Sequence, residues 1–200
     1  MNVYRFSTKL PEGYEQNLDK EYPILFYLKD NRIEQGKTDK KRIDLLKYFQ
    51  QKGIENDIIV VNPHLPAVES WKAAKLYQTL QMLFTMYRID LTRIYFVGLG
   101  YGGFGALKFA TLHPSIPTAI VSISGGGNEN MALYLQQIPV WMIHGIQDEL
   151  IPIHKANSLA SKMEDSVNFK YTVVENQGCN LSKEFFEQND IISWLLINKK

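Results

Sequence analysis

The sequence predicts an α/β domain with a doubly wound, mostly parallel sheet and helices on both of its faces. Short runs rich in β-branched and aromatic residues alternate with longer segments of helical period, and this alternation is typical of parallel βαβ units. Right-handed crossovers between parallel strands place helices on both sides of the sheet. With 200 residues, of which 45% are hydrophobic, the chain is long enough for one full-sized core. We therefore expect a single domain over residues 1–200.

The expected strands follow from six short apolar runs. The first is Ile24-Leu25-Phe26-Tyr27-Leu28, and the second, Ile58-Ile59-Val60-Val61, is closed by Asn62-Pro63. The third, Ile94-Tyr95-Phe96-Val97, leads into a glycine-rich turn. The remaining strands are expected at 119–123, 140–143 and 169–174. Ligand sites of such sheets lie at the carboxyl ends of the strands, so a site is expected in the loops that follow them.

The expected helices lie between and after these strands. One begins around Thr38 and ends before Gly53, a residue suited to a helix C-terminus. Ser70 is expected to cap a long amphipathic helix. The apolar face of that helix is predicted to contain Ala73, Leu76, Tyr77, Leu80, Phe84 and Tyr87. The other helices are expected at 104–112, where His113-Pro114 ends the helix, and near 153–163 and 190–197.

The charge and the hydropathy pattern argue against nucleic acid and membranes as partners. Lys plus Arg number 22 against 21 for Asp plus Glu, so no net field attracts the protein to anionic surfaces. The basic run from Lys37 to Arg42 is short and contains Asp39. Neither the stretch Met1 to Leu10 nor any later segment has the apolar length of a signal peptide or a membrane span. We expect a cytoplasmic protein, and the single cysteine, Cys179, excludes an internal disulfide.

The most specific motif is the turn Gly98-Leu99-Gly100-Tyr101-Gly102-Gly103, which lies between a predicted buried strand and a predicted helix. Its spacing is that of a nucleophile elbow. In an elbow, glycines two residues before and after the centre let the strand and the helix approach closely, and the central residue is held at positive φ. Gly98 and Gly102 are present here, but the central residue is Gly100.

From Tyr4 to its last residue, the chain resembles the α/β hydrolases of the phospholipase/carboxylesterase type and related small esterases. The resemblance rests on the elbow and on further stretches along the chain. These are Tyr22-Pro23, Asn62-Pro63, Ile89-Asp90-Leu91-Thr92-Arg93-Ile94-Tyr95, Gly125-Gly126-Gly127 and Pro139-Val140-Trp141-Met142-Ile143-His144-Gly145. It implies a minimal α/β-hydrolase fold without a lid domain.

The resemblance also implies where the catalytic residues of this family would stand. The serine nucleophile corresponds to Gly100, the triad acid to Asp148, and the histidine to Cys179 or its neighbour, so only the acid is retained. The loop of the oxyanion hole corresponds to Lys29-Asp30-Asn31-Arg32 and lacks the family's His-Gly pair. The backbone N–H of Tyr101 is the one oxyanion donor that could persist.

We expect these positions to form a remnant pocket rather than a working active site, with no metal and no cofactor. The predicted pocket contains Lys29, Asp30, His64, Gly100, Tyr101, Asp148 and Cys179. The glycines also match a dinucleotide loop, but no acidic residue ends the next strand. Cys179 occupies the place of the base, so we interpret it as an inert thiol rather than a substitute nucleophile. His64, Asp148 and Cys179 are suitable residue types for zinc but lack ligand spacing.

Three functions remain open from the sequence. The first is a pseudoenzyme of the esterase family that binds a small carbonyl compound or serves as a scaffold. The second is a hydrolase that uses other residues, for example a water positioned by Asp148 and His64. The third is a structural subunit, either as a homo-oligomer or beside another protein partner.

Overall fold

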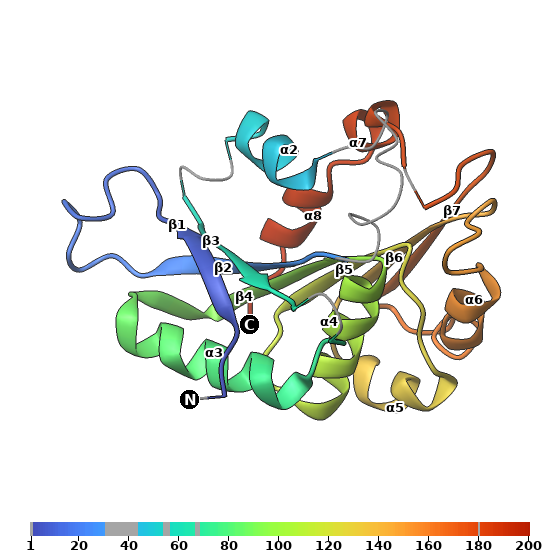
Figure 1. Ribbon diagram of the computed structural model, residues 1–200, viewed down its shortest axis with the longest axis horizontal. Helices are drawn as coiled ribbons and strands as arrows, with labels where there is room; N and C mark the ends of the chain where they lie inside the picture. The colour runs from blue at the N-terminus through green and yellow to red at the C-terminus, as the bar shows by residue number, and fades with distance from the viewer. Residues whose placement is uncertain (1, 31–43, 54–56, 67–68, 180) are drawn as a thin grey trace.

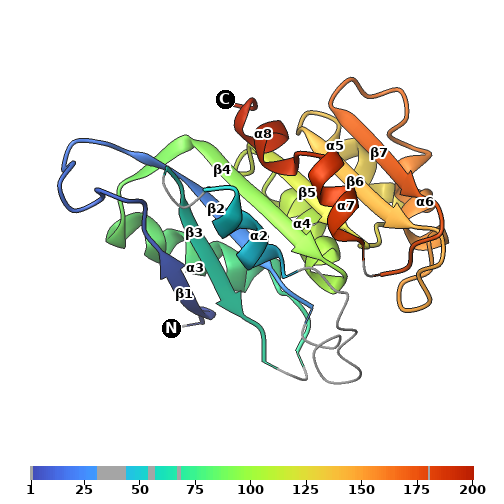
Figure 2. The same cartoon turned by 90° about the horizontal axis from the view of Figure 1, so that it is seen from above.

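The sheet of the computed structural model has seven strands, and its architecture confirms the predicted fold class. The structure describes residues 2–30, 44–53, 57–66, 69–179 and 181–200. The strand order is β1-β3-β2-β4-β5-β6-β7, and only the pair of β1 and β3 is antiparallel. Figure 2 shows the strands fanned out, with β1 at one edge and β7 at the other. No helix in these ranges is long and apolar enough to cross a bilayer.

All six predicted strands are present, and one further strand was missed. They are β2 (Tyr22–Leu28), β3 (Ile59–His64), β4 (Ile89–Leu99), β5 (Ala119–Ile123), β6 (Val140–Gly145) and β7 (Phe169–Val174). The missed strand, β1 (Arg5–Lys9), is an edge strand whose side chains are at most half-buried, so it lacks the apolar run of the others. Strand β4 begins five residues earlier than predicted, because the polar stretch before Ile94 is part of it.

The helices form two layers, as Figure 1 shows. One layer covers one face with α3 (Ala73–Met86), α4 (Tyr101–Leu112), α5 (Ala132–Leu135, preceded by the short helix η2, Glu129–Met131) and α6 (His154–Ala160). The opposite face is covered by α2 (Leu45–Gln51), α7 (Lys183–Gln188) and α8 (Ile191–Leu196). The alternating side chains of each strand enter the two cores in turn: Ile24, Phe26 and Leu28 face the first layer, and Leu25 and Tyr27 face the second.

The helices differ from the prediction at α3, α4 and α7, and the predicted start of the helix before Gly53 is not tested. The predicted start at Thr38 lies outside the described residues, and the described part is capped by Asp44, whose Oδ1 accepts from the backbone N–H of Leu46 and Lys47. Ser70 does not cap α3, because the chain stays extended through Lys72, whose N–H donates to the Tyr4 hydroxyl. Helix α4 begins at Tyr101 rather than Phe104. Helix α7 was not predicted; its short segment is capped by Ser182.

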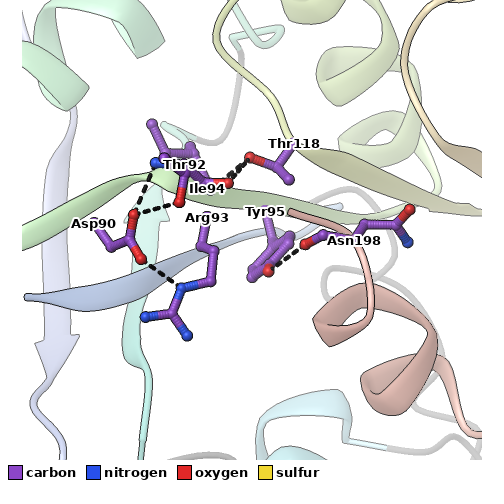
Figure 3. Close-up of polar contacts among 7 residues, drawn as sticks. All are labelled: Asp90, Thr92, Arg93, Ile94, Tyr95, Thr118 and Asn198. Atoms are coloured by element: carbon purple, nitrogen blue, oxygen red, sulfur yellow. Dashed lines mark hydrogen bonds and ion pairs between the residues drawn. The ribbon is translucent and has the colours of Figure 1, made fainter. Parts of the chain in front are cut away.

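A polar cluster fixes the first half of β4 (Figure 3). Asp90 Oδ1 accepts from the N–H and hydroxyl of Thr92, and Asp90 Oδ2 pairs with Arg93 Nε at 2.6 Å. Thr118 Oγ1 accepts from Ile94 N–H and donates to Thr92 O, which joins β4 to the start of β5. These bonds satisfy the polar groups of a segment in which the register between β2 and β4 shifts.

Tyr95 extends this cluster into the second core. Burial raises the pKa of Tyr95 to about 12, so its hydroxyl stays protonated. That hydroxyl donates to the carbonyl of Asn198 at 2.8 Å, as Figure 3 shows. The C-terminal segment is thereby attached to the central strand.

Helix α4 packs directly on the sheet backbone because Gly102 has no side chain. A Cβ at Gly102 would lie 1.9 Å from the carbonyl oxygen of Leu28, which is backbone and cannot move aside. This close approach brings the first turn of α4 to the end of β2.

We expect Gly102→Ala to destabilise the protein by about 3 kcal/mol or more, because the added methyl group must separate α4 from β2. Lys108→Ala, on the exposed side of the same helix, is the control and should change the free energy of unfolding by less than about 0.5 kcal/mol. Urea unfolding measures both. Equal stability of Gly102→Ala and the parent protein would contradict this packing.

The Asp90 cluster predicts a dependence of stability on pH. Burial raises the pKa of Asp90, but hydrogen bonds from Thr92 and Arg93 outweigh burial and leave the pKa below its ordinary value. A lowered carboxyl pKa stabilises the fold above the unfolded pKa of about 3.9, and this contribution is lost as the pH falls through the folded pKa. Between pH 5 and pH 2 the parent should therefore lose more unfolding free energy than Asp90→Asn. Asp165→Asn, at an exposed position, should follow the parent.

Candidate functional site

The candidate site lies at the point where the strand order of the sheet changes direction. From β2 the chain continues to β3 on one side and then to β4 on the other side of β2. Strands β2 and β4 run parallel, with Leu28 opposite Gly98, so the residues that follow the two strands meet at one edge of the sheet. In open α/β sheets, ligands bind in the crevice outside such a pair of strand ends. The residues that meet here are Asp30, after β2, and Gly100, after β4.

Gly100 has the backbone geometry of a nucleophile elbow without the nucleophile. Its φ of 58° and ψ of −122° lie in a region that side chains rarely tolerate. Its N–H donates to Ile123 O, and its carbonyl accepts from Gly103 N–H at 3.0 Å, which starts α4. The turn is therefore fixed on both sides, and it presents the position of the missing side chain to the edge of the sheet.

The carboxylate of Asp30 occupies the space that a side chain at Gly100 would need. A Cβ built on Gly100 would lie 2.4 Å from Asp30 Oδ2. The same oxygen accepts a hydrogen bond from Tyr101 N–H at 2.9 Å. Asp30 is buried, with 3% of its surface exposed. The one oxyanion donor expected to persist is thus bound to a negatively charged side chain of the protein itself.

Trp71 holds the segment that carries Asp30. Its indole Nε1 donates to the carbonyl of Lys29 at 3.0 Å, and its side chain lies where a Cβ on Gly105 would stand. The ring also contacts Tyr4 edge-on, with 5.0 Å between centroids. The sequence analysis did not identify Trp71 as a site residue, and no motif marks it, because it lies in the extended segment before α3 and meets Lys29 only in the fold.

Asp148, at the position of the triad acid, is buried behind β6. Its Oδ1 accepts from the N–H of Leu150 and of Ile151, both at 2.9 Å, which closes a turn rather than capping a helix. Helix α6 begins only at His154, so Asp148 does not cap it. Its Oδ2 is buried and has no hydrogen-bond partner among the described residues. One oxygen of this carboxylate therefore accepts no hydrogen bond from the described residues.

His144 is the imidazole nearest to Asp148. Its Nε2 lies 2.7 Å from Ile151 O and 3.4 Å from Asp148 Oδ2. A carbonyl oxygen only accepts, so Nε2 carries the proton that is shared with Ile151. His144 is 1% exposed and lies within β6, so it stabilises the strand end and does not reach the edge of the sheet.

The segment with Cys179 runs beside the Asp148 turn. Gln147 N–H donates to Gln177 O at 2.9 Å, and a Cβ on Gly178 would lie 3.9 Å from Asp148 Cα. Cys179 is partly buried. The chain thus brings together the segments of Asp148 and Cys179, the two residues that the resemblance predicts at the acid and histidine positions.

His64 lies apart from these groups. It is the exposed last residue of β3, opposite Arg5 of the edge strand. Strands β2, β4 and β5 lie between β3 and β6, so the strand that ends at His64 and the one before Asp148 are roughly 19 Å apart at ~4.8 Å per strand. A water held jointly by His64 and Asp148, or a zinc ion bound by His64, Asp148 and Cys179, does not fit this arrangement. No group of three metal-binding side chains occurs among the described residues.

A hollow of about 190 Å³ opens beside the elbow. Its wall combines the first turn of α4 with the loops after β5 and β6 and the start of α6. It is lined by Tyr101, Phe104, Gly126, Gly127, Leu150, Ile151, Pro152 and Lys155. Of the residues predicted to form a remnant pocket, only Tyr101 lines this hollow. Lys29 lies apart from it, with its Nζ 5.9 Å from the ring centroid of Tyr27.

Solved structures of esterases share this architecture. A thermostable esterase matches over 98% of this chain with a TM-score of 0.78 and 21% identity; the chain spans 59% of that protein's length. Est1E from Butyrivibrio proteoclasticus, in complex with ferulic acid, matches 97% of this chain and 94% of its own, with a TM-score of 0.68 and 13% identity. Esterase PE8 matches over 98% of both chains, with a TM-score of 0.69 and 16% identity.

No model of a known protein family matches the sequence, and no curated protein matches it. The similarity to these esterases therefore lies in the architecture: a mostly parallel seven-stranded sheet, helices on both faces and an elbow after β4. The chain has the α/β-hydrolase fold and shares it with esterases.

Proposed function

We propose that this protein is a pseudoenzyme of the esterase type, which has lost serine hydrolase chemistry and acts by binding a small molecule or as a scaffold. The observation that carries the proposal is the contact between the Asp30 carboxylate and the N–H of Tyr101. At the elbow the nucleophile is absent, and the Asp30 carboxylate occupies the space that its side chain would need.

The charge of Asp30 is the main obstacle to ester hydrolysis. An oxyanion hole lowers the barrier by aiming donors at a developing negative charge, and the loss of one donor costs roughly 10²–10³ in turnover. Here the donor is already bound to an anion. A second negative charge about 4 Å away would add a repulsion of about 4 kcal/mol at an effective dielectric constant of 20. The site thus disfavours the tetrahedral intermediate of acyl transfer.

A hydrolase with a different arrangement is the second candidate, and Asp30 is also the observation that favours it. A buried carboxylate beside the elbow stands near the place where a nucleophile would attack. The position of Asp148, with one oxygen unpaired, adds a second carboxylate at the same edge of the sheet. In this candidate the activity depends on Asp30, so Asp30→Asn separates the two proposals.

We expect the purified protein to hydrolyse short-chain aryl esters no faster than an inert protein and to resist fluorophosphonate labelling, because no serine stands at the elbow. Asp30→Asn serves as the matched variant, since it keeps the shape and removes the charge. Turnover in the parent that disappears in Asp30→Asn would support the second candidate instead. Covalent labelling at a residue near Gly100 other than Asp30 would contradict both.

Rebuilding the catalytic triad tests directly whether the charge of Asp30 prevents ester hydrolysis. Gly100→Ser alone should destabilise the fold by about 1–3 kcal/mol, because a side chain at positive φ is strained and also meets Asp30. It should gain no activity. Adding Asp30→Gly frees Tyr101 N–H, and adding Cys179→His supplies a base beside Asp148, so ester turnover should first appear in the triple variant.

A double variant is the control for this series. Gly100→Ser with Cys179→His retains the Asp30 carboxylate and should stay inactive, whereas it would be active if the triad alone limited turnover. Unfolding midpoints and ester turnover are measured for each protein. Activity in Gly100→Ser alone would reveal a base elsewhere and would overturn the pseudoenzyme proposal.

A further inference from the structure

We propose that the hollow beside the elbow binds a small apolar monocarboxylate, with the ammonium group of Lys155 as its anion contact. The inference rests on the proposed function, since it names the ligand class of a protein that binds without hydrolysis. The argument rests on the hollow itself, on the Lys155 ammonium group and the Asp30 carboxylate near it, and on the exposed apolar side chains at its rim.

The shape of the hollow follows from the glycines after β5. Gly127 N–H donates to Lys155 O at 2.9 Å, which fixes the start of α6 against this loop. A Cβ on Gly126 would lie 3.1 Å from Lys155 Cβ, and one on Gly127 would meet Leu159. The absence of side chains here lets α6 pack closely against the loop, so that α6 forms one wall of the hollow. An apolar cavity of ~150 Å³ holds a benzene ring, so about 190 Å³ is suited to one ring or a short branched chain.

The hollow has a predominantly apolar lining and an apolar rim. Phe104, Ile151 and Pro152 contribute to its wall, and Leu150 and Tyr101 are 57% and 38% exposed at its edge. Exposed apolar groups gathered around a concavity are typical of a ligand site. An apolar body bound here would remove them from water, which stabilises the complex by about 25 cal/mol per Å² of buried surface.

The charged groups near the hollow favour a ligand with an anionic head group. Among the described residues that line the hollow, Lys155 is the only charged one. It forms no ion pair with any residue that the structure describes. Tyr101, which also lines the hollow, binds the Asp30 carboxylate through its N–H. An anionic group is therefore repelled from the elbow and attracted to α6. An ester carbonyl in a working esterase would bind at the elbow, whereas the carboxylate proposed here binds away from it.

Titration of the ¹⁵N-labelled protein with benzoate tests the site, with benzyl alcohol as the uncharged ligand of similar shape. We expect saturable shifts of the amides of Tyr101, Gly126 and Gly127 at roughly millimolar benzoate. Lys155→Met should weaken benzoate binding about tenfold and leave benzyl alcohol unchanged. Lys162→Met, at an exposed position just beyond α6, should bind like the parent.

A second pair of variants does not depend on Lys155. Leu150→Glu places a negative charge on the rim and should abolish benzoate shifts, whereas Leu150→Gln should retain most of the affinity. Absence of saturable shifts at these amides, or equal benzoate affinity in Lys155→Met and Lys162→Met, would overturn the inference. Ester turnover measured on the same samples keeps the two proposals distinguishable, because hydrolysis would refute the pseudoenzyme whether or not benzoate binds.

Discussion

The hydrogen bond from Tyr101 N–H to the Asp30 carboxylate is the interaction around which this end of the sheet is organised. It joins the end of β2 to the first residue of α4, and it requires a central residue without a side chain. Gly100 meets that requirement, because a Cβ there would collide with the same carboxylate oxygen. The glycine at position 100 and the buried carboxylate at position 30 thus depend on each other, since a side chain on residue 100 does not fit beside Asp30.

A glycine at position 100 also has an energetic consequence. A nucleophile at an elbow holds a residue at strained positive φ, and such strain costs of order 1–3 kcal/mol. Glycine adopts the same φ without that cost. The unpaired N–H groups at the start of a helix attract anions, and here an internal carboxylate satisfies one of them. The start of α4 thus avoids that strain and has one of its N–H groups satisfied.

Asp148, the predicted counterpart of the triad acid, has a structural role. Asp148 closes the turn after β6 through two backbone N–H groups, and replacing it would leave those donors unpaired. Its second oxygen is buried without a hydrogen bond, 3.4 Å from His144 Nε2. The presence of an acid at this position is therefore weak evidence of catalysis, because the turn needs the carboxylate whether or not the protein is an enzyme.

The sequence by itself determined the fold class, six of the strands and the elbow, because these depend on local properties: apolar runs, helical period and the spacing of Gly98, Gly100 and Gly102. It also identified the missing nucleophile, since glycine carries no reactive atom wherever it lies. The edge strand β1, helix α7 and the true start of α3 were missed, because each is stabilised by partners distant in the sequence, such as Tyr4 for Lys72.

Only the tertiary structure decided what surrounds Gly100. Asp30 and Tyr101 are 71 positions apart, and they meet because β2 and β4 are neighbours at the switch point of the sheet. The same topology separates His64 from Asp148 and places Lys155, which no motif marked, on the wall of the hollow. Contacts of this kind depend on strand order and register, which residue patterns along the chain do not encode.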